Sequence, residues 1–312
     1  MKYFLFLALA GALGFGQSVV TTYSTDVNGN RVAGSSIVSN DGQRTQITRS
    51  INGRQVPAEQ TTERVISDGP NGRVVEKITK RFDQNGQVAS TDRTVTEEQK
   101  VPNGSITRST IYRGDVNGQM HEAERKTVEV HAQGSSVSTQ TEIARPDLSG
   151  SFQTAEKRLS TSETANNTTH TDETVYRRSE NGSFYPAVRD VSDTTKSGSQ
   201  VEEKSAHYEQ RDNQQLQLMG QTVSTTVKQP NGSSVSEVSL YGANAEDGRA
   251  HDNQSGLHLK EQQTVERMVG PGGNVTEVVT ARRPTVSDPG RLGPSTKISE
   301  TVCTGKCAGG TQ

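Results

Sequence analysis

The stretch KRFDQNGQV, Lys80 to Val88, contains the element from which the organisation of the chain can be read. Its Asn85-Gly86 pair is typical of tight hairpins, because both residues tolerate the positive φ that type I′ turns need. From Gly86 the glycine of this element recurs in steps of 32 residues, and INGRQVPAEQ supplies an earlier copy. The predicted repeat turns are centred on Gly53, Gly86, Gly118, Gly150 and Gly182.

Positions around these glycines recur with the same step. From Gly86 onward an apolar residue follows each glycine by two positions and a basic residue by seven, and an alanine follows most of the five glycines, Gly53 included, by five. Such agreement predicts a tandem repeat. The apolar set is Val88, Met120, Phe152, Phe184 and then Leu216; the alanines are Ala58, Ala123, Ala155 and Ala187; the basic set is Arg93, Arg125, Lys157 and Arg189.

A second set of turns lies between the first. The intervening segments hold about 10 to 15 residues rich in Val, Thr, Ile and Ser, which is typical of strands. We therefore expect an all-β fold, in which tandem ~32-residue two-strand repeats form an extended antiparallel meander sheet of about 14 to 16 strands. The second turns contain Gly42, Gly72, Gly104, Gly134, Gly198, Gly232 and Gly273, with a degraded copy near Asn166-Asn167 and longer final units at Gly248 and Gly290.

The repeat also explains an Arg-Gly-Asp tripeptide at 113–115 that resembles a receptor-binding motif. Arg113 and Asp115 occupy the places that Arg81 and Asp83 occupy one unit earlier, so Arg-x-Asp is the general entry to this turn. We expect the aspartate to accept hydrogen bonds from nearby backbone amides, as in Asx turns. A receptor-binding role is the alternative.

Composition indicates a sheet with little core. Hydrophobic residues make up 29% of the chain, and Leu, Ile, Val and Phe about 17% after the first sixteen residues, below the ~20% at which disorder becomes an option. We expect much of the sheet to be wet on both faces. Disorder is the alternative, above all in TSETANNTTHTDET (161–174) and SDTTKSGSQVEEK (192–204). A propeller, with about four strands per blade, fits a two-strand unit poorly.

The N-terminus predicts export. MKYFLFLALAGALGFG has one lysine, a short apolar run and small residues near Gly16, which is typical of a secretory signal peptide. We expect a signal peptide at 1–16, a β-hairpin repeat domain at 17–298 and a Cys-containing tail at 299–312, in a protein that is secreted or at the cell surface, with the periplasm as an alternative. A membrane-spanning helix would need ~20 consecutive apolar residues, and no later run approaches that length. Membrane-spanning strands would need a continuous apolar outer face, which strand segments such as SITRSTIYRGD do not supply. The sequence thus predicts no membrane-spanning segment.

Charge excludes one class of partner. The 34 basic and 36 acidic residues nearly cancel, the pI is near 6.3, and no basic block is interleaved with aromatics. Nucleic acid is therefore not an expected partner.

The residue pattern also argues against catalysis. Six histidines are scattered without metal-ligand spacing, and no G-x-S-x-G or phosphate loop is present. Neighbouring carboxylates such as Glu97-Glu98 and Glu202-Glu203 would point to opposite faces of a strand. We expect no enzyme, cofactor or resident metal, with weak calcium binding at Asp26, Asp83 or Asp115 as the alternative. The histidines are His121, His131, His170, His207, His251 and His258.

The only two cysteines, Cys303 and Cys307, close the chain in CTGKCAGG. In an exported protein this spacing favours a small terminal disulfide between them, with an intermolecular bridge as the alternative.

Phe82 to Val88, and less closely Asp115 to Met120, resemble the Tyr-Asp-x-x-Gly-Arg-Leu element of bacterial Rhs/YD repeats. The resemblance covers one turn per unit from about Gly53 to Leu216 and implies a secreted β-hairpin scaffold. We therefore expect a non-catalytic exported scaffold, spacer or adhesive surface protein that contacts an extracellular polymer or the cell surface. The alternatives are a fibre subunit assembling with itself through edge strands, and a glycan-binding module that uses Tyr112, Tyr176, Phe184 and Tyr185.

Overall fold

The computed structural model describes residues 16–25, 31–40, 43–51, 54–115, 117–211, 215–243, 257–285 and 291–305. These residues form eighteen strands and one short 3-10 turn, η1 (Pro271–Gly273). The first nine strands are β1 (Gly16–Thr25), β2 (Arg31–Asn40), β3 (Arg44–Ile51), β4 (Arg54–Gly69), β5 (Gly72–Phe82), β6 (Val88–Val101), β7 (Gly104–Gly114), β8 (Met120–Gln133) and β9 (Ser136–Pro146). The others are β10 (Phe152–Ala165), β11 (Thr168–Arg178), β12 (Phe184–Ser197), β13 (Gln200–Gln210), β14 (Leu216–Lys228), β15 (Ser234–Gly242), β16 (His258–Val269), β17 (Val275–Arg282) and β18 (Thr296–Gly305).

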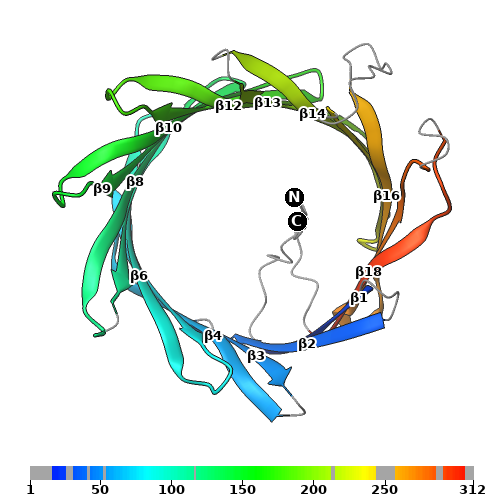
Figure 1. Ribbon diagram of the computed structural model, residues 1–312, viewed down its shortest axis with the longest axis horizontal. Helices are drawn as coiled ribbons and strands as arrows, with labels where there is room; N and C mark the ends of the chain where they lie inside the picture. Colours follow the sequence, from blue (N-terminus) through cyan, green and yellow to red (C-terminus); the bar gives the residue numbers. More distant parts are fainter. Residues whose placement is uncertain are drawn as a thin grey trace.

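Each strand pairs antiparallel with the next strand in the chain, which confirms the predicted meander. The meander also closes on itself, because Ser18–Ser24 of β1 pair with 299–305 of β18. Figure 1 shows the result as strands arranged around a circle, with the first strands beside the last. The sheet has more strands than the 14 to 16 expected, and its first and last strands cover each other's edges.

The connections lie alternately on two rims of this ring, as an antiparallel meander requires. We call the rim with the turns of Gly86, Gly118, Gly150 and Gly182 the glycine rim. The opposite rim, here the short-turn rim, has two-residue connections at 70–71, 102–103, 134–135, 166–167 and 198–199.

A β-bulge recurs near the glycine rim and explains the repeated alanine. In the β7–β8 ladder Tyr112 pairs with Glu122 and Ile111 with Glu124, so Ala123 is the additional residue. Ala155 in the β9–β10 ladder and Ala187 in the β11–β12 ladder are additional residues of the same kind. Ala58 is the additional residue in the β3–β4 ladder. Because a bulge bends its strand and increases local twist, the repeated bulges contribute to the curvature that closes the ring.

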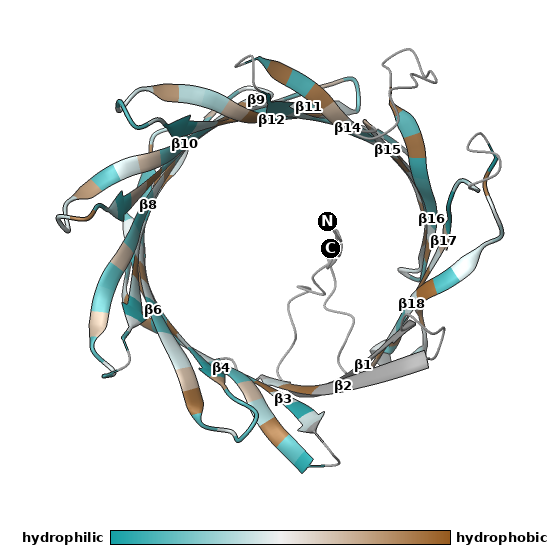
Figure 2. Cartoon of the chain, viewed as in Figure 1, coloured by the Kyte–Doolittle hydropathy of each residue, from teal (hydrophilic) through white to brown (hydrophobic). Residues whose placement is uncertain are grey.

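Little of the chain is buried. The solvent-accessible surface is 20679 Å², whereas a compact monomer of 33.6 kDa would expose about 12,700 Å². Figure 2 shows hydrophilic and hydrophobic residues interspersed along the strands rather than gathered into a continuous apolar layer. The fold is therefore held mainly by backbone ladders and by side-chain contacts between neighbouring strands.

Buried apolar side chains lie on one side of the sheet. Ile143, Val175, Val275 and Cys303 are buried, and strand alternation with the ladder registers places all four on the same face. Val275 and Cys303 are directly paired and pack with Val269. We call this the apolar face, and the face that carries Tyr112, Phe152, Phe184 and Tyr208 the aromatic face.

The structure can be compared with three expectations from the sequence: disorder in two segments, a C-terminal tail and a signal peptide. Disorder is wrong for 161–174 and 192–204, which lie in β10–β11 and β12–β13 with their two-residue turns. Residues 299–305 of the segment expected as a tail belong to β18. The expected signal peptide lies outside the described residues except for Gly16, the first residue of β1.

Candidate functional site

The turns of the glycine rim are three-residue loops with one residue in the left-handed conformation. Gly86, Gly118, Gly150 and Gly182 have φ of +82°, +79°, +82° and +88°. The amide of each donates to the carbonyl three residues earlier, at 2.9 to 3.2 Å. Asn85 and Asn117 do not share the positive φ, so the expectation of type I′ turns is wrong here. The geometry matches a β-turn followed by a left-handed residue, as three-residue hairpin loops use. Gly53 lies outside the described residues.

Aspartate holds the entry to this loop, as predicted. Oδ1 of Asp115 accepts hydrogen bonds from the amides of Asn117 and Gln119, both at 2.8 Å. Asp83 and Asp147 accept the equivalent pairs at 2.8 to 3.1 Å. The pKa of Asp115 is lowered, first by the hydrogen bond from the Gln119 amide and next by the contact of Oδ2 with His121 Nε2 at 3.1 Å. The Asp of the Arg-Gly-Asp tripeptide is thus engaged in its own turn.

The type I′ conformation occurs where the repeat looked degraded. Asn166 and Asn167 both have positive φ, 48° and 65°, as a two-residue type I′ turn requires. In the Pro102-Asn103 connection only Asn103 has positive φ, 61°, as expected after proline in a type II turn. The short-turn rim therefore keeps its loop length while the turn type changes with the sequence.

Each short turn is tied to the following hairpin by a backbone hydrogen bond. The amide of Ala132 donates to the carbonyl of Asn103 at 2.6 Å, and that of Lys196 to Asn167 at 2.9 Å. The same bond forms from Lys100 to Asn71, Thr164 to Ser135 and Lys228 to Ser199, at 2.9 to 3.0 Å. Successive units are thus connected at the rim as well as along the ladder.

The repeated basic residues form the most regular side-chain feature of the ring. Each lies against an aromatic ring: Arg93 over Tyr112 at 5.1 Å, Arg125 over Phe152 at 4.3 Å, Lys157 over Phe184 at 5.2 Å and Arg189 over Tyr208 at 6.0 Å from cation to ring centroid. These distances fall within the range of cation–π attraction. The sequence showed the basic set but not its pairing with these rings. Tyr112 and Tyr208 lie on the next strand, whereas Phe152 and Phe184 lie on the second strand along.

A carboxylate completes each of these clusters. Arg93 contacts Glu76 at 2.7 Å, Arg125 contacts Glu122 at 2.5 Å, Lys157 contacts Glu142 at 2.9 Å and Arg189 contacts Asp172 at 2.5 Å. Glu76 also contacts Arg64 at 2.7 Å, and the hydrogen bond from Arg93 lowers the pKa of Glu76. We call these four groupings the cation–aromatic clusters. Three of the ion pairs join a strand to the one before it, whereas Arg125 is paired within β8 and reaches β10 through the ring of Phe152.

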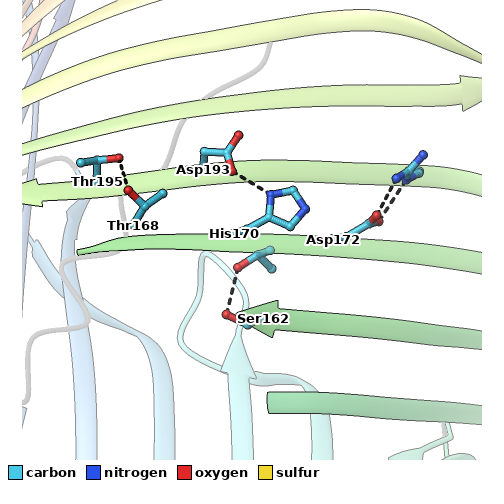
Figure 3. A network of polar contacts seen from close by, with 8 residues as sticks. Ser162, Thr168, His170, Asp172, Asp193 and Thr195 are labelled. Atoms are coloured by element: carbon cyan, nitrogen blue, oxygen red, sulfur yellow. Dashed lines mark hydrogen bonds and ion pairs between the residues drawn. The ribbon is translucent and has the colours of Figure 1, made fainter. Parts of the chain in front are cut away.

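Figure 3 shows how such polar contacts cross the ladder between β10 and β12. His170 Nδ1 lies 2.7 Å from Asp193 Oδ1, and the hydroxyls of Thr168 and Thr195 are 3.0 Å apart. Asp172 accepts two hydrogen bonds from Arg189, at 3.0 and 2.5 Å. Thr171 donates to Ser162 at 3.2 Å on the other face. Opposite charges and paired hydroxyls between strands stabilise sheets in this way.

One histidine lies between two carboxylates on the apolar face. His207 Nδ1 is 2.6 Å from Asp190 Oδ1, and Nε2 is 3.1 Å from Glu209 Oε1. Burial alone would lower the pKa of His207, but the hydrogen bonds to Asp190 and Glu209 outweigh it and the pKa is raised. His207 thus links β12 and β13, and the raised pKa means that these contacts favour its protonated form.

The candidate metal and glycan residues are not brought together. Among the described residues, no group of three or more His, Cys, Asp and Glu side chains is placed to hold a metal ion; Asp26 and His251 lie outside them. Tyr112, Tyr176 and Phe184 lie on the aromatic face and Tyr185 on the apolar face, because Phe184 and Tyr185 are neighbours in β12. Cations cover the rings of Tyr112 and Phe184.

The cysteine prediction can be followed only in part. Cys303 is 1% exposed and pairs with Val275 of β17 and Val20 of β1. Cys307 lies outside the described residues, so its pairing with Cys303 stays a prediction. The structure does place the first cysteine at the seam where the ring closes.

No protein-family model and no curated protein matches this chain. The resemblance to Rhs/YD repeats therefore stays a prediction. In the part of the chain that the structure describes, no helix has the length and hydropathy to cross a membrane.

Proposed function

We propose that this chain is an exported, non-catalytic β-repeat scaffold that presents a regular surface to an extracellular polymer or to the cell surface. One observation carries the proposal: the residues that recur with the 32-residue step all build the sheet. The aspartate and glycine form the turn, the alanine forms the bulge, and the basic residue contacts side chains of other strands. A repeat of this kind maintains a shape around the ring rather than a single reactive locus.

Export and the terminal disulfide belong to the same proposal. The apolar run before Gly16 supports a signal peptide at 1–16 and a location outside the cell or in the periplasm. An oxidising compartment would allow Cys303 and Cys307 to form a disulfide. N-terminal sequencing of the secreted protein should find a mature chain that starts near Gln17, and a full-length protein retained inside the cell would contradict export.

The scaffold role is tested by altering one repeat at a time. Purified mature protein is incubated with isolated cell-surface polysaccharide, and the bound fraction is measured by co-sedimentation. The variants are Arg93→Gln, Arg125→Gln and Arg189→Gln, each checked for its β-sheet circular dichroism. A surface made of equivalent units predicts a partial loss of binding of similar size in each folded variant. Complete loss in one variant, with the others unchanged, would indicate a single localised binding site instead.

A further inference from the structure

We infer that the N-terminal hairpin β1–β2 can exchange between two copies of this chain, giving a dimer in which each ring is completed by the partner's hairpin. The partner is a second copy because only an identical ring offers the same two neighbours, β18 and β3. This inference is independent of the scaffold role. Hairpin exchange is a different route to self-assembly from the edge-strand pairing considered from the sequence, because β1 and β18 pair with each other.

Among the described residues, the ladder registers attach this hairpin to its neighbours at fewer positions than an interior hairpin. It contacts the remaining ring through seven residue pairs with β18 and five with β3. The equivalent interior hairpin β7–β8 is held by ten pairs with β6 and nine with β9. Strand pairing is the main source of stability in a sheet with so few buried side chains. Detaching β1–β2 therefore costs less than detaching an interior hairpin.

The β2–β3 ladder is short because the two strands overlap only in part. Pairing runs from Ser36–Asn40 to Thr45–Arg49, so in the described ladder the first half of β2, Arg31 to Ser35, is not paired with β3. The one pair of large apolar side chains in this ladder is Val38 with Ile47. By contrast β1 and β2 pair with each other over ten residues. The hairpin is thus internally well paired and weakly attached, as a unit that exchanges whole should be.

Exchange restores every pairing that opening breaks. In the dimer, the incoming hairpin meets the same β18 and β3 residues in the same register, so the closed and exchanged states differ little in contacts. Domain swapping is a low-cost route to dimers under these conditions. The balance is set by concentration, since two chains combine into one particle.

The Val38–Ile47 pair provides a direct readout. In the double variant Val38→Cys/Ile47→Cys, a disulfide at this position lies within one chain in the closed monomer and between two chains in the exchanged dimer. Each single variant cannot form this bond and serves as the control for cross-links that involve Cys303 or Cys307. A second control, Val95→Cys/Thr110→Cys, uses a directly paired position of the interior β6–β7 ladder and should cross-link only within a chain.

The protein is unfolded in denaturant, refolded at three concentrations, separated by size and oxidised before non-reducing electrophoresis. The inference predicts a dimer whose ratio to monomer rises about tenfold for each tenfold rise in monomer concentration, with the 38–47 disulfide between chains in the dimer alone. Refolding only to monomer at every concentration would overturn it. A dimer whose 38–47 disulfide stays within each chain would also overturn it, because association would then use another surface.

Discussion

The substitution Gly104→Ala tests whether this glycine serves a turn or a close contact between strands. Gly104 lies in the short-turn set, but Asn103 and not Gly104 has the positive φ. A Cβ built on Gly104 would lie 1.8 Å from the carbonyl oxygen of Val130 on β8, whereas ordinary contact begins near 3.4 Å. The two backbones would have to separate by roughly 1.6 Å, the difference between those distances.

That separation sets the size of the effect. Overpacking costs about 1 to 3 kcal/mol, and each ladder hydrogen bond weakened at Gly104 contributes about 0.5 to 1.5 kcal/mol. We therefore expect Gly104→Ala to lower the free energy of unfolding by about 3 kcal/mol. The matched control is Gly134→Ala, where φ is +61° and no atom lies within 4 Å of the new Cβ. It should cost only the left-handed backbone penalty of about 1 to 2 kcal/mol.

Urea denaturation of both variants, followed by far-ultraviolet circular dichroism, gives the comparison. The slope of the unfolding free energy against urea should stay similar, so that the midpoints report stability. A Gly104→Ala midpoint at or above that of Gly134→Ala would refute the close approach of β7 and β8 at this glycine.

Three further predictions concern side chains. Asp115→Ala should lower the unfolding midpoint and leave cell attachment unchanged, because Oδ1 holds two turn amides; the reverse result would favour receptor binding. The raised pKa of His207 adds stability that is fully present below the unfolded pKa and lost as pH rises through the folded pKa. The stability lost in His207→Gln should therefore be larger at pH 5 than at pH 9, and a loss that does not change with pH would contradict a stabilising contact of protonated His207 with Asp190 and Glu209. A double-mutant cycle of Arg189→Gln and Asp172→Asn should give a coupling below about 1 kcal/mol that shrinks in high salt, since both groups are partly solvated; coupling that salt does not change would show a desolvated pair.

The candidate site was partly visible in the sequence. The step of 32 residues identified the basic set, because a basic side chain recurs at this position in each unit. The set is Arg93, Arg125, Lys157 and Arg189. The rings of Phe152 and Phe184 recur with the same step, but their contacts with these cations and the identity of the carboxylates were not predictable from it. Glu122 precedes Arg125 within β8, whereas Glu76 and Glu142 lie on the preceding strand. Those partners depend on register, which the bulges shift by one residue.

The sequence by itself determined the hairpins, since turn formation depends on a few adjacent residues. The loop of Gly118 and the bulge of Ala123 follow from residues within one unit, and the meander follows from short connections between strands. Closure was decided only by the tertiary structure. The pairing of Val20 with Cys303 joins residues at opposite ends of the described chain, and whether they meet depends on twist, tilt and bulges summed over all eighteen strands. No local pattern contains that sum, because each repeat contributes only a small rotation.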